Sequence, residues 1–301
     1  MVSGRFASIT NPILDPAPGY SVRDPLLFCH DGVVHCHYSA VERAGDHSTF
    51  YLETISSSDL VEWSQPRRLT DSALGFSSPG SIIRVGDGWV MSLQSYPILP
   101  GEKRAGESAR LWLMASPDLE NWNDPVPINP DGARVNWSES RRQIDPCLVE
   151  HDGRYWCLYK TSGCLGLLVS DDLARWQEAS PDRPVFGRDD SPDGSPVENP
   201  CVLRVGDEFV LFFTPCREGR GVGVARSRDL VSWRDARYLD FPDIPWAQSG
   251  PSAAMVIDLR ATFGKWVMAF HGERKSQGTF AAALGLAWSD DLEHWVTPHS
   301  R

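Results

Sequence analysis

The stretch Ser57-Ser58-Asp59-Leu60-Val61-Glu62-Trp63 carries a pattern, Ser-x-Asp-Leu-x-x-Trp, that occurs five times in 301 residues. The other four copies run from Ser116 to Trp122, Ser170 to Trp176, Ser227 to Trp233 and Ser289 to Trp295. Successive Trp residues are 59, 54, 57 and 62 positions apart. Ser and Asp can hydrogen-bond their own backbone to close a turn, while Leu and Trp offer apolar bulk to a neighbouring unit. The chain therefore contains five copies of one structural unit.

Each copy of the motif ends one strand-like run and follows two others. In the first unit, Pro25 opens LLFCH, the Asp31-Gly32 turn precedes VVHCHYS, and STFYLETIS leads into the motif at Ser57. Asp-Gly between two apolar runs is a strong signal for a β-hairpin. Each unit therefore predicts three antiparallel strands, and the segment after its Trp can supply a fourth.

Five such units without a capping unit favour a closed ring over a linear stack. We predict an all-β fold, a single five-bladed β-propeller of four-stranded antiparallel blades that spans residues 1–301. The expected blades cover approximately residues 21–70, 76–130, 143–185, 196–240 and 248–298. Only six residues follow Trp295, so we expect residues 5–10 to complete the last blade.

Charge and composition exclude several classes of function. The 29 Lys and Arg residues against 40 Asp and Glu residues give a net charge of -11, which is unsuited to binding nucleic acid. No signal-peptide pattern or long apolar run is present, so we expect a cytoplasmic protein with no membrane partner. The cysteine count, seven, is odd, and most of these residues sit in apolar runs, which favours buried, reduced thiols.

The first strand of each blade lines the axis of a propeller, so residues near the start of these strands should meet at one mouth. The aligned residues are Asp24, Ser78, Asp145, Glu198 and Gly250. An Asp before Pro can simply initiate a turn. Three carboxylic acids in one ring, however, suit glycoside hydrolysis, in which one acid protonates the leaving oxygen and one carboxylate activates water or attacks carbon. Clustered carboxylates could instead bind Ca²⁺ or Mg²⁺.

The sequence resembles glycoside hydrolase family 43 and its five-bladed propeller relatives from about Ser21 to Trp295. The motifs that carry the resemblance are Arg23-Asp24-Pro25-Leu26, Ile144-Asp145-Pro146 and Val197-Glu198-Asn199-Pro200, together with the five turns. The resemblance implies that Asp24 is the general base, that Glu198 is the general acid, and that Asp145 keeps Glu198 protonated and orients the substrate. It also implies inversion and a substrate that contains pentoses.

Asn199 departs from the family pattern, which commonly has Gly after the acid. The retaining sucrose- and fructan-cleaving relatives open with Asn-Asp-Pro-Asn-Gly and place Cys after the acid. This chain has Asp24-Pro25-Leu26-Leu27 and Glu198-Asn199 instead, which favours the inverting family.

Several further residues are candidates for contacting the substrate. His271 stands near the end of the run WVMAFHG, and the resemblance places a histidine there near the substrate or, through water, near a central Ca²⁺; it could equally be a hydrogen-bonded core residue. Arg274 could reach the mouth or remain a solvated loop charge. Trp246 and Trp137 could stack on a sugar or serve in packing, and Ser78 is the hydroxyl member of the ring.

Arg141 and Arg142 precede Asp145, and either could pair with a carboxylate or be surface charge. Cys164 and Cys216 show no neighbouring base that would activate a thiol, so we interpret them as bystanders.

The leading functional hypothesis is an inverting glycosidase that acts on short pentose-containing oligosaccharides, with no required cofactor and a possible central Ca²⁺. One alternative is a non-catalytic propeller that binds carbohydrate or metal. Others are a propeller phosphorylase, which would need a basic cluster at the mouth, and a retaining fructosidase-like enzyme. The sequence leaves the oligomeric state open.

Overall fold

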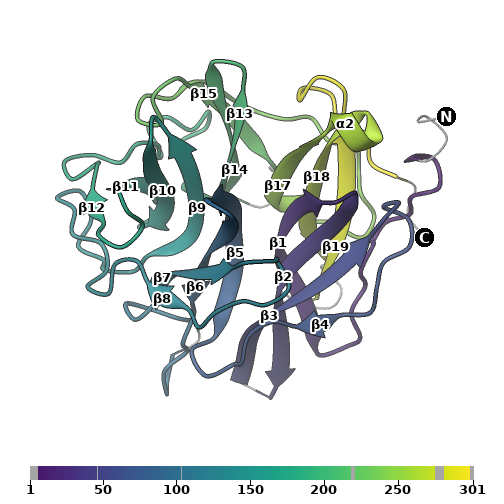
Figure 1. Cartoon of the computed structure of the whole chain (residues 1–301), viewed down its shortest axis with the longest axis horizontal. Coiled ribbons are helices and arrows are strands. Elements are labelled where there is room, and N and C mark those ends of the chain that lie inside the picture. The colour runs from purple at the N-terminus through teal and green to yellow at the C-terminus, as the bar shows by residue number, and fades with distance from the viewer. Residues whose placement is uncertain (1–5, 46, 103, 218–220, 275–280, 299–301) are drawn as a thin grey trace.

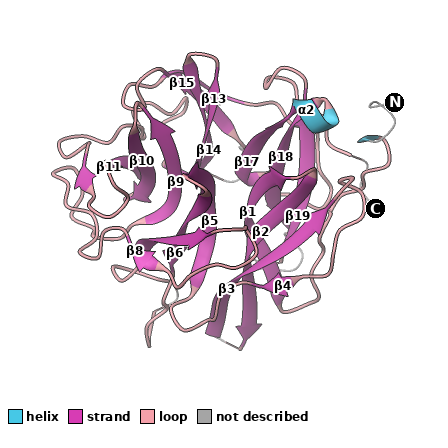
Figure 2. Ribbon diagram, in the orientation of Figure 1, coloured by secondary structure: helices cyan, strands magenta, loops and turns pink. Residues whose placement is uncertain are grey.

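A computed structural model describes residues 6–45, 47–102, 104–217, 221–274 and 281–298. Its strands form five antiparallel sheets around a common centre (Figure 1), and almost all of the remaining chain is loop (Figure 2). The predicted all-β fold with five propeller blades is confirmed.

The strands follow the same order in every blade. The first strands, nearest the centre in Figure 1, are β1 (Tyr20–His30), β5 (Phe76–Val85), β9 (Ile144–His151), β13 (Val197–Val205) and β17 (Ser252–Leu259). The second strands are β2 (Val33–Ala44), β6 (Gly88–Ser95), β10 (Arg154–Thr161), β14 (Glu208–Pro215) and β18 (Lys265–Glu273). The third strands are β3 (His47–Ser57), β7 (Arg110–Ser116), β11 (Cys164–Ser170), β15 (Gly223–Ser227) and β19 (Ala282–Ser289). The outer strands of the first four blades are β4 (Arg67–Arg68), β8 (Val126–Pro127), β12 (Gln177–Glu178) and β16 (Arg234–Tyr238).

The N-terminal segment completes the fifth blade, but not through residues 5–10. Ile13 N–H donates to the carbonyl of Leu284 in β19 at 2.8 Å, and Leu284 N–H donates to the carbonyl of Leu14 at 3.0 Å. The side-chain amide of Asn11 also bridges the N–H and the carbonyl of Leu286, at 2.9 Å each. The edge pairing therefore lies at residues 11–14.

Residues 6–10 have a different role, and Arg5 lies outside the described residues. Phe6 and Ile9 are buried and pack in the core between the first and fifth blades. The closing hydrogen bonds to β19 are made by Ile13 and Leu14, after the expected segment, while the side chains of Phe6 and Ile9 fill the junction between the two blades.

The recurrent motif closes the turn after the third strand of each blade. In the fourth blade, the Ser227 hydroxyl accepts the N–H of Leu230 at 3.0 Å, and Asp229 Oδ1 accepts the N–H groups of Val231 and Ser232 at 2.9 and 2.7 Å. The motif leucine lies in the left-handed region in all five turns, with φ between 62 and 66°. This conformation is costly for a residue with a Cβ, so the Ser and Asp hydrogen bonds must hold it.

The apolar cores lie between the blades. One buried cluster joins each neighbouring pair of sheets, and the cluster between the first and fifth blades contains Val22 and Cys36 of one and Val267 and Leu284 of the other. All seven cysteines are free, and Cys36, Cys147, Cys157 and Cys201 are buried, as the apolar runs predicted, whereas Cys29 is only partly buried. The ring is therefore closed by hydrophobic packing as well as by strand pairing.

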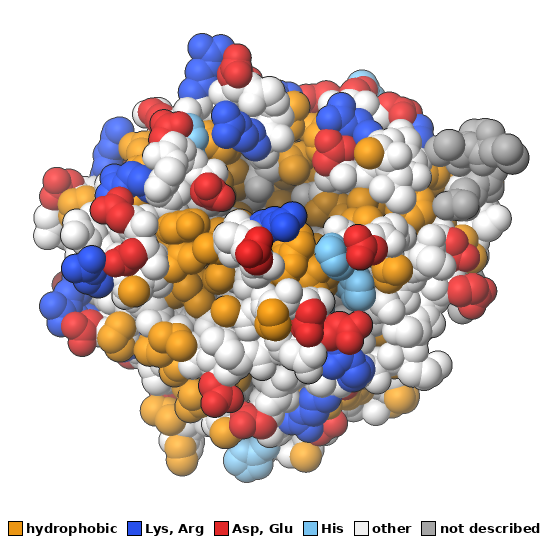
Figure 3. Space-filling model, viewed as in Figure 1, with side chains coloured by type: hydrophobic (Ala, Val, Ile, Leu, Met, Phe, Trp, Pro, Cys, Tyr) orange, Lys and Arg blue, Asp and Glu red, His pale blue; other side chains and the backbone are white. Residues whose placement is uncertain are grey.

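The remaining features concern the surface and the helices. In the described ranges, no helix has the length and apolar character needed to cross a membrane. The short helix α2 (Arg260–Phe263) joins β17 to β18. On the face drawn in Figure 3, acidic and basic side chains are interspersed.

Replacing Asp229 by alanine removes the acceptor of two backbone N–H groups in the fourth turn. We expect the Asp229→Ala variant to lose about 1 kcal/mol of unfolding free energy, as for a lost helix cap. The exposed Asp243, changed to alanine, is the control. Urea denaturation measures both variants, and equal stability of the two would contradict the role of the turn.

Candidate active site

A bend recurs in the first strand of every blade. Asp24, Ser78, Asp145, Asn199 and Ala253 all have φ between 47 and 54°, and strand register is interrupted beside each of them. Asn199 and Ala253 therefore occupy the ring positions that the sequence alignment gave to Glu198 and Gly250. The alignment was wrong at these two places, because the proline next to the bend is replaced by alanine in the fifth blade and Glu198 precedes the bend.

The N–H of each bent residue needs an acceptor, and the second strand of the preceding blade supplies it in four of five cases. The acceptors are Ser39 Oγ for Ser78 at 2.7 Å, Gln94 Oε1 for Asp145 at 2.6 Å, Thr214 Oγ1 for Ala253 at 2.8 Å and His271 Nδ1 for Asp24 at 3.1 Å. These four residues occupy equivalent positions on the second strands, opposite the residue before the bend. They bind each blade to the next at the mouth of the ring.

Lys160 occupies the equivalent position in the third blade, where it pairs with Ile144. An ammonium group has no acceptor. The N–H of Asn199 therefore turns to Asp145 Oδ2, at 3.3 Å. Lys160 instead forms an ion pair with Glu198, in which the two side chains are only 12% and 30% exposed.

The structure brings the three predicted acids to one cavity. Asp24, Asp145 and Glu198 all line a cavity of about 370 Å³. A second cavity of about 450 Å³ shares Glu198 and several other wall residues with it. Both volumes are in the range of small-ligand sites.

The acids differ in their access to the cavity. Asp145 is buried, with Oδ1 accepting the Ser78 hydroxyl at 3.3 Å. The side chain of Asp24 is 20% exposed, and its Oδ2 accepts the Ser39 hydroxyl at 3.0 Å. Asp24 and Glu198 can therefore meet a ligand, while Asp145 lies behind them.

Burial raises the pKa of Asp145 to about 6, with Glu198 and Asp24 adding to the shift and Lys160 opposing it. Burial also raises the pKa of Asp24 despite the opposing charge of Arg23. Burial alone would raise the pKa of Glu198 too, but the ammonium of Lys160 outweighs it and the net pKa of Glu198 is lowered. The direction of this shift is opposite to the expected protonation of Glu198, because the ammonium of Lys160 stabilises the Glu198 carboxylate.

His271 is buried and neutral. Burial and the charge of Arg23 hold the pKa of His271 well below its usual range. The N–H of Asp24 can only donate, and Nδ1 of His271 accepts from it in the tautomer that carries the ring proton on Nε2. Nε2 lies 3.3 Å from the guanidinium of Arg23. His271 thus positions the backbone of Asp24 and also lines both cavities.

The surroundings of His271 do not fit a calcium ion. The guanidinium beside Nε2 would repel a cation, and imidazole is a poor ligand for Ca²⁺. Among the residues with described positions, no group of three or more His, Cys, Asp or Glu side chains is arranged to hold a metal.

The remaining predicted residues divide into those that face a cavity and those that do not. Arg274 lines the larger cavity and pairs with Asp15 at 2.7 Å. Arg142 lines the smaller one, whereas Arg141 lines neither. Ser78 is buried behind the acids, at a central space of about 30 Å³.

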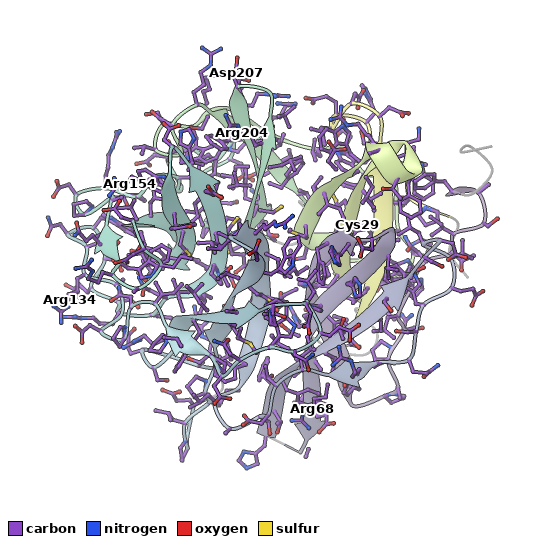
Figure 4. All side chains as sticks on the ribbon, in the orientation of Figure 1. Cys29, Arg68, Arg134, Arg154, Arg204 and Asp207 are labelled. Atoms are coloured by element: carbon purple, nitrogen blue, oxygen red, sulfur yellow. The ribbon has the colours of Figure 1, made fainter. Side chains whose placement is uncertain are left out.

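The two tryptophans are not placed for stacking on a sugar in these cavities. Trp246 is 5% exposed, and its ring stacks on Phe270 at 5.5 Å, so the stacking prediction for Trp246 was wrong. Trp137 donates its indole N–H to the carbonyl of Ser180 at 2.9 Å and lines neither cavity. Arg134, three residues earlier, lies at the periphery in Figure 4.

Sequence reasoning missed Lys160, Ser39, Gln94 and Thr214. A signal was present, because the second-strand runs RYWCLYK and WVMAFH end with Lys160 and His271 at equivalent positions. Cys216 was interpreted as a bystander, and burial raises the pKa of its thiol to about 12, which makes it a poor nucleophile. Cys216 nevertheless lines the larger cavity together with Glu198.

No protein-family model and no curated protein matches the chain by sequence. Solved structures match it over nearly its whole length. A complex of BT0996 with RGII has a TM-score of 0.70 and 16% identity, and the match covers 100% of this protein and 97% of the other. A thermostable family-43 glycoside hydrolase has a TM-score of 0.65 and 15% identity, with coverage of 96% and 95%.

A third similar structure comes from work on the GH130 family of mannoside phosphorylases, which contains glycoside hydrolases that target β-1,2-mannosidic linkages in Candida mannan. Its TM-score is 0.69 at 15% identity, and the match covers 97% of this protein and 93% of the other. The chain therefore shares its five-bladed fold with propeller glycoside hydrolases of more than one family.

Removing the ammonium of Lys160 should reverse the pKa shift of Glu198. In Lys160→Met, burial remains but the neighbouring positive charge is lost, so the pKa of Glu198 should move from below to above its ordinary value. A ¹³C carboxyl titration by NMR, assigned with Glu198→Gln, measures this. Lys265→Met, which removes a cation paired with the exposed Asp290, is the control. An unchanged Glu198 titration would contradict the assigned ion pair.

The raised pKa of Asp145 should appear in the pH dependence of stability. An Asp whose pKa is about 4 in the unfolded state and about 6 in the folded state leaves the free energy of unfolding unchanged below pH 4. Above pH 6 it lowers the free energy of unfolding by about 3 kcal/mol. The wild type should therefore lose stability relative to Asp145→Asn between pH 4 and pH 6. Denaturation at several pH values tests this, and a constant difference would contradict it. Asp243→Asn is the control.

Proposed function

We propose that the protein is a glycoside hydrolase whose reaction takes place where Asp24 and Glu198 face one cavity. The observation that carries the proposal is this pair of carboxyl groups with opposite pKa shifts, raised at Asp24 and lowered at Glu198. Glycoside hydrolysis needs one protonated and one ionised carboxyl group on either side of the bond. Pairs whose surroundings separate their pKa values identify such acid and base roles.

The charge states support roles opposite to those that the family-43 resemblance implies. Glu198, held ionised by Lys160, is suited to activate water or attack carbon. Asp24, whose pKa burial raises, is suited to donate the proton to the leaving oxygen. The buried Asp145 then influences the pKa values of both groups through its charge. His271 fixes the backbone of Asp24.

The substrate and stereochemistry are narrower parts of the proposal. The family-43 resemblance supports a pentose-containing oligosaccharide and inversion. The GH130 neighbour supports phosphate-dependent cleavage or a hexose substrate equally well. NMR of the first-formed anomer distinguishes inversion from retention, and a requirement for phosphate would identify a phosphorylase.

A panel of nitrophenyl pentosides and hexosides tests the activity itself. We expect turnover of at least one compound, and we expect Glu198→Gln to lower kcat by about 10²- to 10⁴-fold. The control is Glu150→Gln at the exposed β9–β10 hairpin. Retained sugar binding without turnover of any glycoside would instead support a binding propeller.

The leaving group separates the two assignments of the acid. If Asp24 donates the proton, Asp24→Asn should retain substantial activity on dinitrophenyl glycosides, which leave without protonation, and lose it on unactivated oligosaccharides. Glu198→Gln should then fail on both. The reverse pattern would restore the roles implied by the resemblance.

A further inference from the structure

Six cationic side chains line the two cavities of the site, and four of them have a carboxylate partner. Those four are Arg23 with Glu273, Lys160 with Glu198, Arg217 with Asp193 and Arg274 with Asp15. The other two are Arg104 and Arg142. Within the described part of the chain, neither forms an ion pair, and both line the 370 Å³ cavity that contains the three acids.

Arg142 is held at the wall of this cavity by Tyr96. Its Nη2 lies 3.4 Å from the Tyr96 hydroxyl, and its guanidinium lies 5.6 Å from the centre of the Tyr96 ring. The Nε–H of Arg142 is buried and has no hydrogen-bond partner among the described residues. This nitrogen is covered by protein, so only the terminal nitrogens of the Arg142 guanidinium can reach a ligand in the cavity.

The neighbouring ring provides an apolar surface beside these cations. Tyr96 packs on Phe50 with ring centres 5.0 Å apart, and both residues line the same cavity. An aromatic wall with two guanidinium groups offers contact for the apolar face of a sugar together with a place for an anion.

The charge of the whole chain makes these two cations unusual. The protein carries 40 acidic against 29 basic residues, so carboxylates to neutralise an arginine are abundant. Arg141, next to Arg142 in sequence, does not line the cavity, so the basic pair in this wall is a property of the fold and not of a basic segment. Arginine is well suited to hold a carboxylate through two parallel hydrogen bonds.

We propose that Arg104 and Arg142 bind the carboxylate of an acidic sugar, so that the substrate of this site contains a uronosyl residue. The inference rests on the proposed glycosidase function and narrows it to acidic oligosaccharides. The acidic residue can lie beside the cleaved sugar, so a pentose at the point of cleavage remains compatible. Free phosphate has related chemistry, and the experiment separates the two sources.

Binding is measured by calorimetry with Asp24→Asn, which removes the proposed proton donor but keeps the Lys160–Glu198 ion pair, so that no turnover is required. The ligands are methyl uronides of the gluco, galacto and manno series, each compared with the neutral methyl glycoside of the same configuration. We expect at least one uronide to bind about tenfold or more tightly than its neutral partner, and this preference to fall with added salt. Arg142→Gln or Arg104→Gln, added to this background, should abolish the preference.

Two arginines serve as matched controls. Arg141→Gln removes the adjacent charge, and Arg204→Gln removes an exposed one close to the labelled Asp207 in Figure 4. Both should leave the preference unchanged. Arg142 is partly buried, so Arg142→Gln can fail to fold. Arg104 is exposed, and Arg104→Gln then provides the test on its own.

The outcomes distinguish this inference from the proposed function. If no uronide exceeds its neutral partner, or if Arg141→Gln has the same effect as Arg142→Gln, the carboxylate assignment is overturned. Inorganic phosphate that accelerates cleavage by the wild type and yields a sugar phosphate would also overturn it. A uronide preference without turnover by the wild type would support the subsite and contradict only the glycosidase proposal.

Discussion

The arrangement of the blades at the mouth of the ring depends on one group in each blade, the backbone N–H of the bent residue in the inner strand. The left-handed bend removes this N–H from the regular sheet ladder, and a buried donor must find an acceptor. The preceding blade supplies one from Ser39, Gln94, Thr214 or His271. The same hydrogen bonds that satisfy the backbone therefore set the relative positions of neighbouring blades, and with them the positions of the acids.

The third blade is the exception, and the chemistry of the site follows from it. Lys160 cannot accept a hydrogen bond, so the N–H of Asn199 uses Asp145 and the ammonium pairs with Glu198. One residue type at one ring position thus lowers the pKa of Glu198, while burial raises the pKa of Asp145 and Asp24. Three carboxyl groups of similar intrinsic acidity thereby have pKa values shifted in different directions, down at Glu198 and up at Asp145 and Asp24.

This arrangement is unfavourable for stability. Burying Asp145 next to two other acids opposes its ionisation, and two arginines face the same cavity without an ion-pair partner in the described structure. Proteins commonly retain such groups where a ligand supplies what the fold leaves unsatisfied. The blade junctions, with their continuous apolar cores, provide the stability that this site does not.

Local signals in the sequence were enough to predict the five blades, their strand order and the approximate place of the three acids. They were enough because the turn motif and the Asp-Gly hairpins repeat with the period of one blade. Asp24 and Asp145 precede proline at the bend, so their equivalence was visible, whereas Ala253 has no proline after it.

The groups that touch across blade boundaries became known only from the folded structure. The folded structure was needed for four features: the pairing of Lys160 with Glu198, the separation of Arg142 from Arg141, the burial of Trp246 and the closing of the fifth blade at residues 11–14. These contacts join segments distant in the chain, and the direction of a side chain at a bend depends on the neighbouring blade. A local pattern identifies the blade, but the pKa of an acid at its inner end depends on charges that other blades bring to it.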